Sequence, residues 1–260
     1  MTSQARPRLL LIHGLLGSLS YFEPQRYLPG VEVFTPDLVG YGQRRSEDTG
    51  ITLPGQAAML ARFLRDEACG PAWVLGHSVG GAVAMLLADM APDLVRGLIS
   101  VEGNFTLKDA FWAGRIAALP EADWAAEYGA MEAAPAAWLE KCGIEASDER
   151  VAWARDILAN QPYTTVQKMA QSVLDTTGAP DYLGCVGRVL ARATSRGSPL
   201  FLVGGEQSAA GWDVPDWVLA QARRVCVQPK TGHMMMLEDP ATFCRIVESI
   251  LYDGDCRSGA

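Results

Sequence analysis

The sequence predicts an α/β fold in which a mostly parallel sheet is flanked by helices. Short apolar runs, typical of strands buried on both faces, alternate with helical segments near both ends of the chain. Between these parts, residues 105–195 contain no convincing strand and several helical segments. We therefore expect residues 1–104 and 196–260 to form an α/β core domain, with residues 105–195 inserted as an all-helical cap, or lid, domain.

Six segments are predicted as strands because each is a short apolar run bounded by glycine, proline or polar residues. They are residues 8–12, 31–35, 73–75, 95–101, 199–204 and 224–227. Helical periodicity predicts helices over residues 53–68, 82–90 and 240–251. Within the insertion, four prolines stand where a helix can begin: Pro120, Pro135, Pro162 and Pro180.

Composition and charge argue against several classes of partner. The chain has 260 residues and a formal net charge of -8, with no basic run, which disfavours nucleic acid and anionic membrane surfaces. No segment is apolar for long enough to span a bilayer. Residues 1–8 lack the apolar stretch of a signal peptide, and the six cysteines are scattered. A reduced, cytoplasmic setting is therefore expected.

The sequence carries no pattern for a metal or a cofactor. Its only histidines, His13, His77 and His233, are too few and too far apart for the usual metal-ligand sets. The Gly-x-Gly-x-x-Gly dinucleotide fingerprint is missing, and the predicted cap has no arginine cluster for a phosphate. We expect no cofactor, no metal, and a small to medium, apolar, uncharged acyl substrate. The oligomeric state is left open, with a homodimer as one alternative.

The most informative stretch is Gly76-x-Ser78-x-Gly80, between a predicted strand and a predicted helix. A serine on such a sharp turn is held in strained backbone, with its hydroxyl exposed at the carboxyl edge of the sheet. The glycines avoid collisions with neighbouring backbone. The N–H groups that begin the helix favour a developing negative charge. Ser78 is therefore predicted to be a nucleophile rather than a solvated turn residue.

A serine hydroxyl needs a base within hydrogen-bond reach to take its proton as it attacks. His77 is adjacent to Ser78, so its side chain should point elsewhere, and His13 belongs to an early glycine-containing loop. Both are interpreted as structural. His233 follows the last predicted strand, in a loop that also contains glycine, and is the predicted base.

Four blocks of the sequence together resemble the α/β-hydrolase superfamily. They are His-Gly-Leu-Leu-Gly at 13–17, the glycine-punctuated loop 36–46, Gly-His-Ser-Val-Gly-Gly at 76–81, and the segment 231–240. The resemblance implies the α/β-hydrolase fold, a serine nucleophile, a late histidine base and an intervening acid. It also implies a lid inserted after the sixth strand of that fold, which is where residues 105–195 stand.

The acid is assigned from a departure from the family pattern. In most relatives it follows the strand that is here 199–204, in a Gly-Glu-x-Asp type of loop, but Ser208 stands where the aspartate is expected. A minority, including haloalkane dehalogenases and a fungal zearalenone lactonase, resemble one another in placing a glutamate after the preceding strand. Here that residue is Glu102, at a strand end that faces the ligand-bearing edge. Glu102 is preferred, with Asp213 and Glu206 as alternatives.

The resemblance also implies where the oxyanion and the substrate would bind. Two N–H groups should donate to the oxyanion: that of Val79, directly after the nucleophile, and that of Leu15, with Leu16 as the fallback. Aromatic residues near the acid and methionines near the base can line a pocket, although core packing is the alternative for each. The residues predicted to bind substrate are Leu16, Phe105, Trp112 and Met234.

These features predict a cofactor-independent serine hydrolase that cleaves a carboxylic ester, lactone or thioester through an acyl-enzyme on Ser78. The alternative functions are carbon–carbon bond hydrolysis, acyl transfer or a lyase reaction with the same three residues, because function lies in the site rather than the fold. A non-catalytic binding protein is disfavoured by the intact Ser78 and His233. A haloalkane dehalogenase is disfavoured because its nucleophile is an aspartate.

Overall fold

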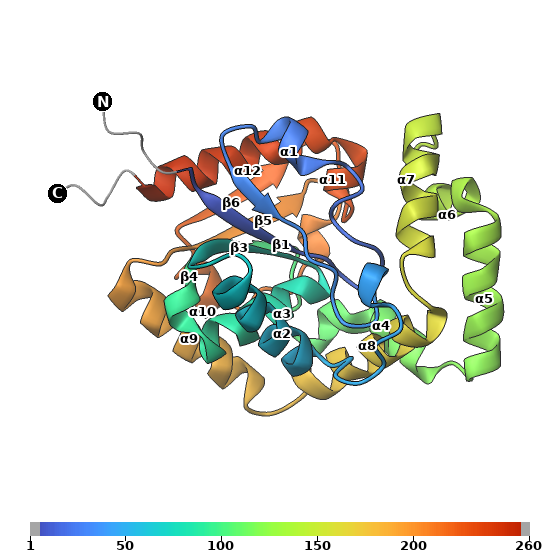
Figure 1. Ribbon diagram of the computed structural model, residues 1–260, viewed down its shortest axis with the longest axis horizontal. Helices are drawn as coiled ribbons and strands as arrows, with labels where there is room; N and C mark the ends of the chain where they lie inside the picture. Colours follow the sequence, from blue (N-terminus) through green and yellow to red (C-terminus); the bar gives the residue numbers. More distant parts are fainter. Residues whose placement is uncertain (1–5, 256–260) are drawn as a thin grey trace.

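The structure of the protein, a computed structural model, describes residues 6–255. Its strands form one sheet in the order β2-β1-β3-β4-β5-β6, and every pairing is parallel (Figure 1). They are β1 (Arg8–Ile12), β2 (Glu32–Phe34), β3 (Ala72–His77), β4 (Val95–Val101), β5 (Leu200–Gly205) and β6 (Arg224–Gln228). The predicted α/β class and all the predicted strands are confirmed.

Strand β1 shows why these apolar runs become central strands. Leu9 and Leu11 point to one face of the sheet, and Leu10 and Ile12 point to the other. All four side chains are at most 3% exposed, so both faces need a helical cover. The strand lies between β2 and β3, where both of its edges are paired.

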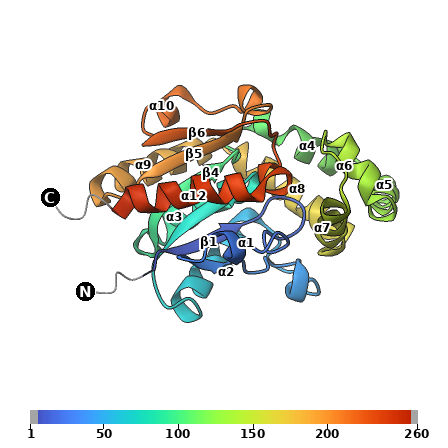
Figure 2. The same ribbon diagram turned by 90° about the horizontal axis from the view of Figure 1, so that it is seen from above.

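Helices cover both faces of the sheet (Figure 2). One face carries α2 (Leu53–Asp66), α3 (Val79–Met90) and α9 (Tyr182–Arg196), and the other carries α1 (Pro24–Tyr27) and α12 (Pro240–Asp255). Helix α3 is apolar almost all round because it lies directly on the sheet between α2 and α9. The single-turn helices α10 (Asp216–Leu219) and α11 (Met235–Glu238) follow β5 and β6.

The chain between β4 and β5 is helical, as predicted. After the short α4 (Phe111–Ala118) come α5 (Glu121–Ala133), α6 (Pro135–Lys141), α7 (Asp148–Ala159) and α8 (Tyr163–Thr177). Pro120, Pro135 and Pro162 stand directly at the starts of α5, α6 and α8. Helices α5, α6 and α7 lie beyond the carboxyl ends of the strands (Figure 1). The insertion therefore stands at the edge of the sheet where Ser78 was predicted to be exposed.

Helix α9 lies differently from the rest of the insertion. It contributes Val186 and Leu190 to the core cluster that covers the sheet, and its Arg188 and Arg192 pair with Asp89 of α3. An amphipathic helix buries its apolar face on the nearest apolar surface, which here is α3. By its contacts α9 belongs to the core layer, although the predicted cap extends to residue 195. The division at residues 104 and 196 itself stays a prediction.

Within residues 6–255 no helix is long and apolar enough to cross a membrane. Nor does any group of three or more His, Cys, Asp or Glu side chains there have a geometry that could hold a metal ion. Residues 1–5, which entered the prediction about a signal peptide, and Cys256 lie outside the described range.

Candidate active site

Ser78 occupies the turn between β3 and α3. Its φ of 54° and ψ of -125° form a strained conformation that non-glycine residues rarely adopt. The flanking glycines are required: a Cβ on Gly76 would lie 2.2 Å from the Gly80 carbonyl oxygen, and one on Gly80 would lie 2.4 Å from that of Ile12. The strained turn expected from Gly76-x-Ser78-x-Gly80 is therefore present, with Ser78 only half-buried.

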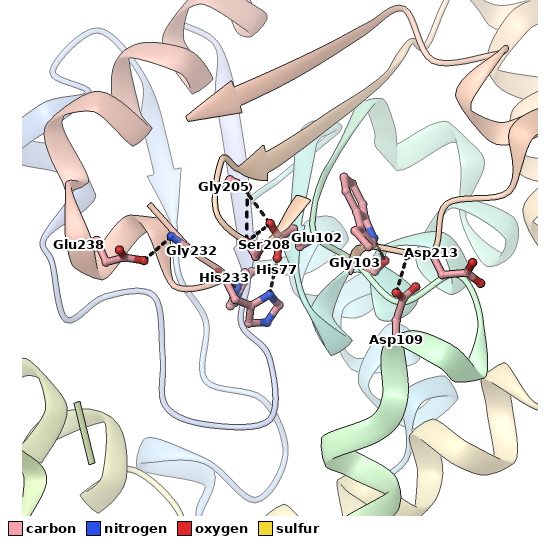
Figure 3. Close-up of polar contacts among 11 residues, drawn as sticks. His77, Glu102, Gly103, Asp109, Gly205, Ser208, Asp213, Gly232, His233 and Glu238 are labelled. Atoms are coloured by element: carbon pink, nitrogen blue, oxygen red, sulfur yellow. Dashed lines mark hydrogen bonds and ion pairs between the residues drawn. The ribbon is translucent and has the colours of Figure 1, made fainter. Parts of the chain in front are cut away.

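Glu102 and His233 contact each other directly (Figure 3). His233 Nδ1 lies 2.7 Å from Glu102 Oε2. Glu102 follows β4, has a φ of 41° and is 6% exposed, whereas the His233 side chain, in the loop after β6, is 46% exposed. An ionised carboxylate only accepts hydrogen bonds, so Nδ1 carries the proton of the neutral imidazole. Its Nε2 is then free to exchange a proton with a reacting group.

The other oxygen of Glu102 is held by the end of β5 and the loop that follows it. Ser208 Oγ donates to Glu102 Oε1 at 2.6 Å, and the Gly205 N–H donates to the same oxygen at 2.8 Å. Burial alone would raise the pKa of Glu102, but the hydrogen bond and charge of His233, with the bonds from Ser208 and Gly205, lower it. Glu102 is thus ionised at neutral pH. Sequence reasoning missed this role of Ser208, although its place in the usual acid loop was the signal.

The two alternative acids lie elsewhere. Asp213 accepts from Thr106 Oγ1 and pairs with Lys108 Nζ at 3.2 Å. Glu206 accepts from the Lys230 N–H at 2.7 Å. In Figure 3 Asp213 lies beside Asp109, whose carboxylate accepts from the Asp213 N–H at 2.8 Å. The structure therefore brings Glu102, and neither alternative, to the imidazole.

Ser78 and His233 come to the same edge of the sheet, but no hydrogen bond joins them within residues 6–255. His77 connects the two segments: its Nε2 donates to the His233 carbonyl oxygen at 2.9 Å, and the two rings lie 4.7 Å apart. The pKa of His77 is lowered to about 3, mainly by burial and to a smaller extent by the nearby charge of His233. His77 therefore stays neutral. Bonds between nucleophile and base are often longer in enzymes without a bound substrate. His77, interpreted as structural, thus fastens the loop of the predicted base.

A second contact holds that loop one residue before His233. Glu238 Oε1 accepts from the N–H of Gly232, the residue before His233, at 2.8 Å (Figure 3). The Glu238 carbonyl oxygen in turn accepts from Arg150 of α7 at 2.7 Å. Sequence reasoning missed both contacts, although Glu238 belongs to the block 231–240 that carried the family resemblance.

The loop after β1 passes close to Ser78. A Cβ on Gly14 would lie 3.1 Å from the Ser78 Cβ, which is tighter than ordinary van der Waals contact, so the loop backbone packs closely against Ser78. His13 is buried, donates from Nδ1 to the Gly14 carbonyl oxygen, and has its pKa lowered to about 4 by burial. Val79 is the first residue of α3, where N–H groups lack a partner within the helix. Of the predicted oxyanion donors, Val79 directly follows Ser78 along the chain, and Leu15 directly follows Gly14, the residue that lies against Ser78. Their role as donors stays a prediction.

The residues predicted to bind substrate differ in their exposure. Leu16, Trp112 and Met234 are half-buried at the borders of apolar clusters. Phe105 is 1% exposed and packs against Trp212, with ring centroids 6.1 Å apart. Its ring offers almost no surface to a substrate in this conformation. Substrate binding by the four residues stays a prediction.

The fold and the arrangement at its strand ends agree with a known protein family. A family model described as the alpha/beta hydrolase family matches residues 9–246. The chain belongs to the alpha/beta hydrolase family. This membership confirms the resemblance seen in the four sequence blocks, and the six-stranded parallel sheet flanked by helices is the corresponding fold.

Two relatives of this hydrolase carry lipase names. Lipase LipV of Mycobacterium tuberculosis is 37% identical over 97 residues, which are 36% of this chain and 36% of that protein. The sn-1-specific diacylglycerol lipase ABHD11 of Xenopus laevis is 36% identical over 100 residues, 37% of this chain and 32% of that protein. The chain thus matches about a third of the length of these curated relatives.

Solved structures with a similar fold align with nearly the whole chain. A thermophilic esterase from Thermogutta terrifontis has a TM-score of 0.68 at 21% identity, covering 95% of this chain and 90% of that chain. The haloalkane dehalogenase DbeA from Bradyrhizobium elkani has a TM-score of 0.73 at 23% identity, covering 98% and 93%. These likenesses show a common fold.

Proposed function

We propose that this alpha/beta hydrolase is a serine hydrolase that cleaves a carboxylic ester, lactone or thioester of a small to medium apolar substrate. The observation that carries the proposal is the 2.7 Å contact between His233 Nδ1 and Glu102, at the sheet edge where Ser78 occupies its strained turn. The lipase names of two relatives support the choice of an ester bond.

In the proposed acylation step, Ser78 Oγ attacks the carbonyl carbon while His233 Nε2 takes the hydroxyl proton. The ionised Glu102 stabilises the imidazolium that forms and keeps the ring in the tautomer that leaves Nε2 free. The N–H groups of Val79 and Leu15 donate to the oxyanion of the tetrahedral intermediate. His233 then gives its proton to the leaving group, and the acyl group stays bound to Ser78.

In the proposed deacylation step, water attacks the acyl group on Ser78 while His233 takes a proton from it. The carboxylic acid leaves, and the proton returns from His233 to Ser78. The exposed side chain of His233 gives water direct access to the imidazole. The mechanism uses only groups of the chain and requires neither a metal nor an organic cofactor.

The test is the variant Ser78→Ala, measured on a panel of p-nitrophenyl esters, lactones and thioesters. We expect turnover to fall by about five to six orders of magnitude, the scale seen when a serine nucleophile is removed. Ser46→Ala, at an exposed serine of the loop 36–46, is the matched control and should keep full activity. Unchanged ester hydrolysis by Ser78→Ala, with circular dichroism confirming its fold, would refute the mechanism.

A fluorophosphonate probe separates the reaction types that these residues can support. Labelling of Ser78 together with ester turnover supports the proposal. If Ser78 is labelled but no ester, lactone or thioester is cleaved, the chemistry is instead carbon–carbon bond hydrolysis, acyl transfer or a lyase reaction. Intact-protein mass spectrometry after mixing with a p-nitrophenyl ester would detect the acyl-enzyme itself.

A further inference from the structure

Gln161, between α7 and α8, joins the inserted helices to the loop after β1. It is 1% exposed, and its Oε1 accepts from the Gly17 N–H at 2.8 Å. Its Nε2 donates to Tyr128 Oη of α5 and to the Ile157 carbonyl oxygen. Both ends of the amide are therefore satisfied in a buried site, which favours a single geometry for the groups that it joins.

Packing reinforces this hydrogen bond. Gly17 has a φ of 75°, and a Cβ there would lie 2.8 Å from Ile157 Cγ2, so the loop lies directly against α7. One residue before Gln161, the Asn160 carbonyl oxygen accepts from the Gly42 N–H at 2.8 Å. The segment after α7 is thus attached to the core at two neighbouring points.

The same loop carries one of the two proposed oxyanion donors, Leu15. At its start, Gly14 lies against Ser78, and the Leu15 carbonyl oxygen accepts from Tyr41 Oη at 2.9 Å. The Gly17 N–H at its other end is held by Gln161. Peptide units are planar, so these two bonds fix the peptide units from Leu15 to Gly17, which include the N–H of the fallback donor Leu16. They also restrain the chain directly after the unit that carries the Leu15 N–H. One of these two anchors, Tyr41, belongs to the core, and the other, Gln161, belongs to the inserted helical segment.

We propose that Gln161 is a positioning residue for the oxyanion hole: it orients the loop of Leu15 through Gly17 without contacting the substrate. The proposal rests on the proposed serine hydrolase function. Removal of the acceptor at Gln161 releases the Gly17 N–H, and the loop then samples orientations in which its N–H groups miss the oxyanion. The loss falls on the transition state, where the negative charge develops, and spares substrate binding.

The decisive variant is Gln161→Leu, which has a similar volume and no acceptor for Gly17. We expect kcat to fall about tenfold, less than when an oxyanion donor is deleted outright, with KM nearly unchanged. The preference for an ester over its thionoester should also shrink, because a C=S group accepts hydrogen bonds weakly and gains little from an oxyanion hole. Gln161→Met, of equal chain length, replaces Gln161→Leu if the latter does not fold.

Tyr128→Phe is the matched control, because it removes a partner of Gln161 within the inserted helices and keeps the bond to Gly17. It should lower the melting temperature while keeping kcat and the ester preference of the wild type. Equal losses of kcat in both variants, with an unchanged ester preference, would overturn the proposal because the network would then act on stability alone.

Amide hydrogen exchange tests the same contact without any substrate. The Gly17 amide should exchange slowly in the wild type and in Tyr128→Phe, and at least about tenfold faster in Gln161→Leu, because its buried acceptor is gone. Unchanged exchange in Gln161→Leu would refute the proposal. Failure of the proposed function would appear separately, as ester hydrolysis that Ser78→Ala leaves intact, and would remove this inference with it.

Discussion

The loops after β4 and β5 lie side by side at the carboxyl edge of the sheet, but their polar groups act in opposite ways. The loop after β4 supplies an acceptor, the nearly buried carboxylate of Glu102. The end of β5 and the loop after it supply two donors to that carboxylate, the Gly205 N–H and the Ser208 hydroxyl. The carboxylates of this second loop, Glu206 and Asp213, bind other partners.

The difference shows how the position of an acid can move between neighbouring strands. A buried carboxylate is costly unless donors surround it. Glu102 receives three, from His233, Ser208 and Gly205. An aspartate at position 208 would instead bring a second negative charge to within hydrogen-bond distance of Glu102, and two such carboxylates do not both stay ionised. Serine at 208 is therefore the complement of glutamate at 102.

The largest effect that tests this comparison comes from neutralising each acid in turn. Glu102→Gln should lower kcat by about three or more orders of magnitude. The imidazolium of His233 loses its counter-charge, and the neutral ring is no longer held in the tautomer that leaves Nε2 free. Asp213→Asn and Glu206→Gln are the matched controls and should retain most activity. Steady-state kinetics on an ester accepted by the wild type measures all three. A collapse of activity in Asp213→Asn, with Glu102→Gln unaffected, would reverse the assignment.

A smaller effect should follow when the loop after β5 loses its donor. Ser208→Ala removes one of the three hydrogen bonds to Glu102, and we expect kcat to fall about tenfold, as for one bond to a charged group. Ser208→Thr keeps a hydroxyl and should restore much of the rate. If Ser208→Ala matches the wild type in kcat, the contribution of this loop to the site is negligible.

The smallest expected effect is on stability in acid. The pKa of folded Glu102 lies below its ordinary value, since the bonds from His233, Ser208 and Gly205 outweigh burial. Its contribution to the free energy of unfolding is therefore complete above the unfolded pKa of 4.5 and is lost as the pH falls through the folded value. Urea unfolding at a series of pH values between 6 and 3 (roughly the range of carboxylate titration) gives the free energy of unfolding at each pH. As the pH falls, this free energy should decrease less for Glu102→Gln than for the wild type. Parallel curves would contradict this.

Much of the fold followed from local patterns. All the strands appeared as short apolar runs, because each strand is buried on both faces and must be apolar along its whole length. The strained turn of Ser78 was predicted from Gly76-x-Ser78-x-Gly80, since the collisions that exclude side chains there come from residues close in sequence or from the adjacent strand. The membership of α9 in the core layer was not predicted, because helical periodicity shows an apolar face but not what covers it.

The sequence by itself determined the α/β class, the strained turn at Ser78 and the short choice of candidate acids, because strand ends and turns are local features that neighbouring residues specify. Only the tertiary structure decided which carboxylate meets His233, 131 residues away from Glu102 along the chain. It likewise decided that the Ser208 hydroxyl, where the family pattern has an aspartate, donates to that carboxylate. It also decided that Gln161 holds Gly17 across 144 residues. Such contacts depend on how distant segments pack, and no local periodicity encodes them.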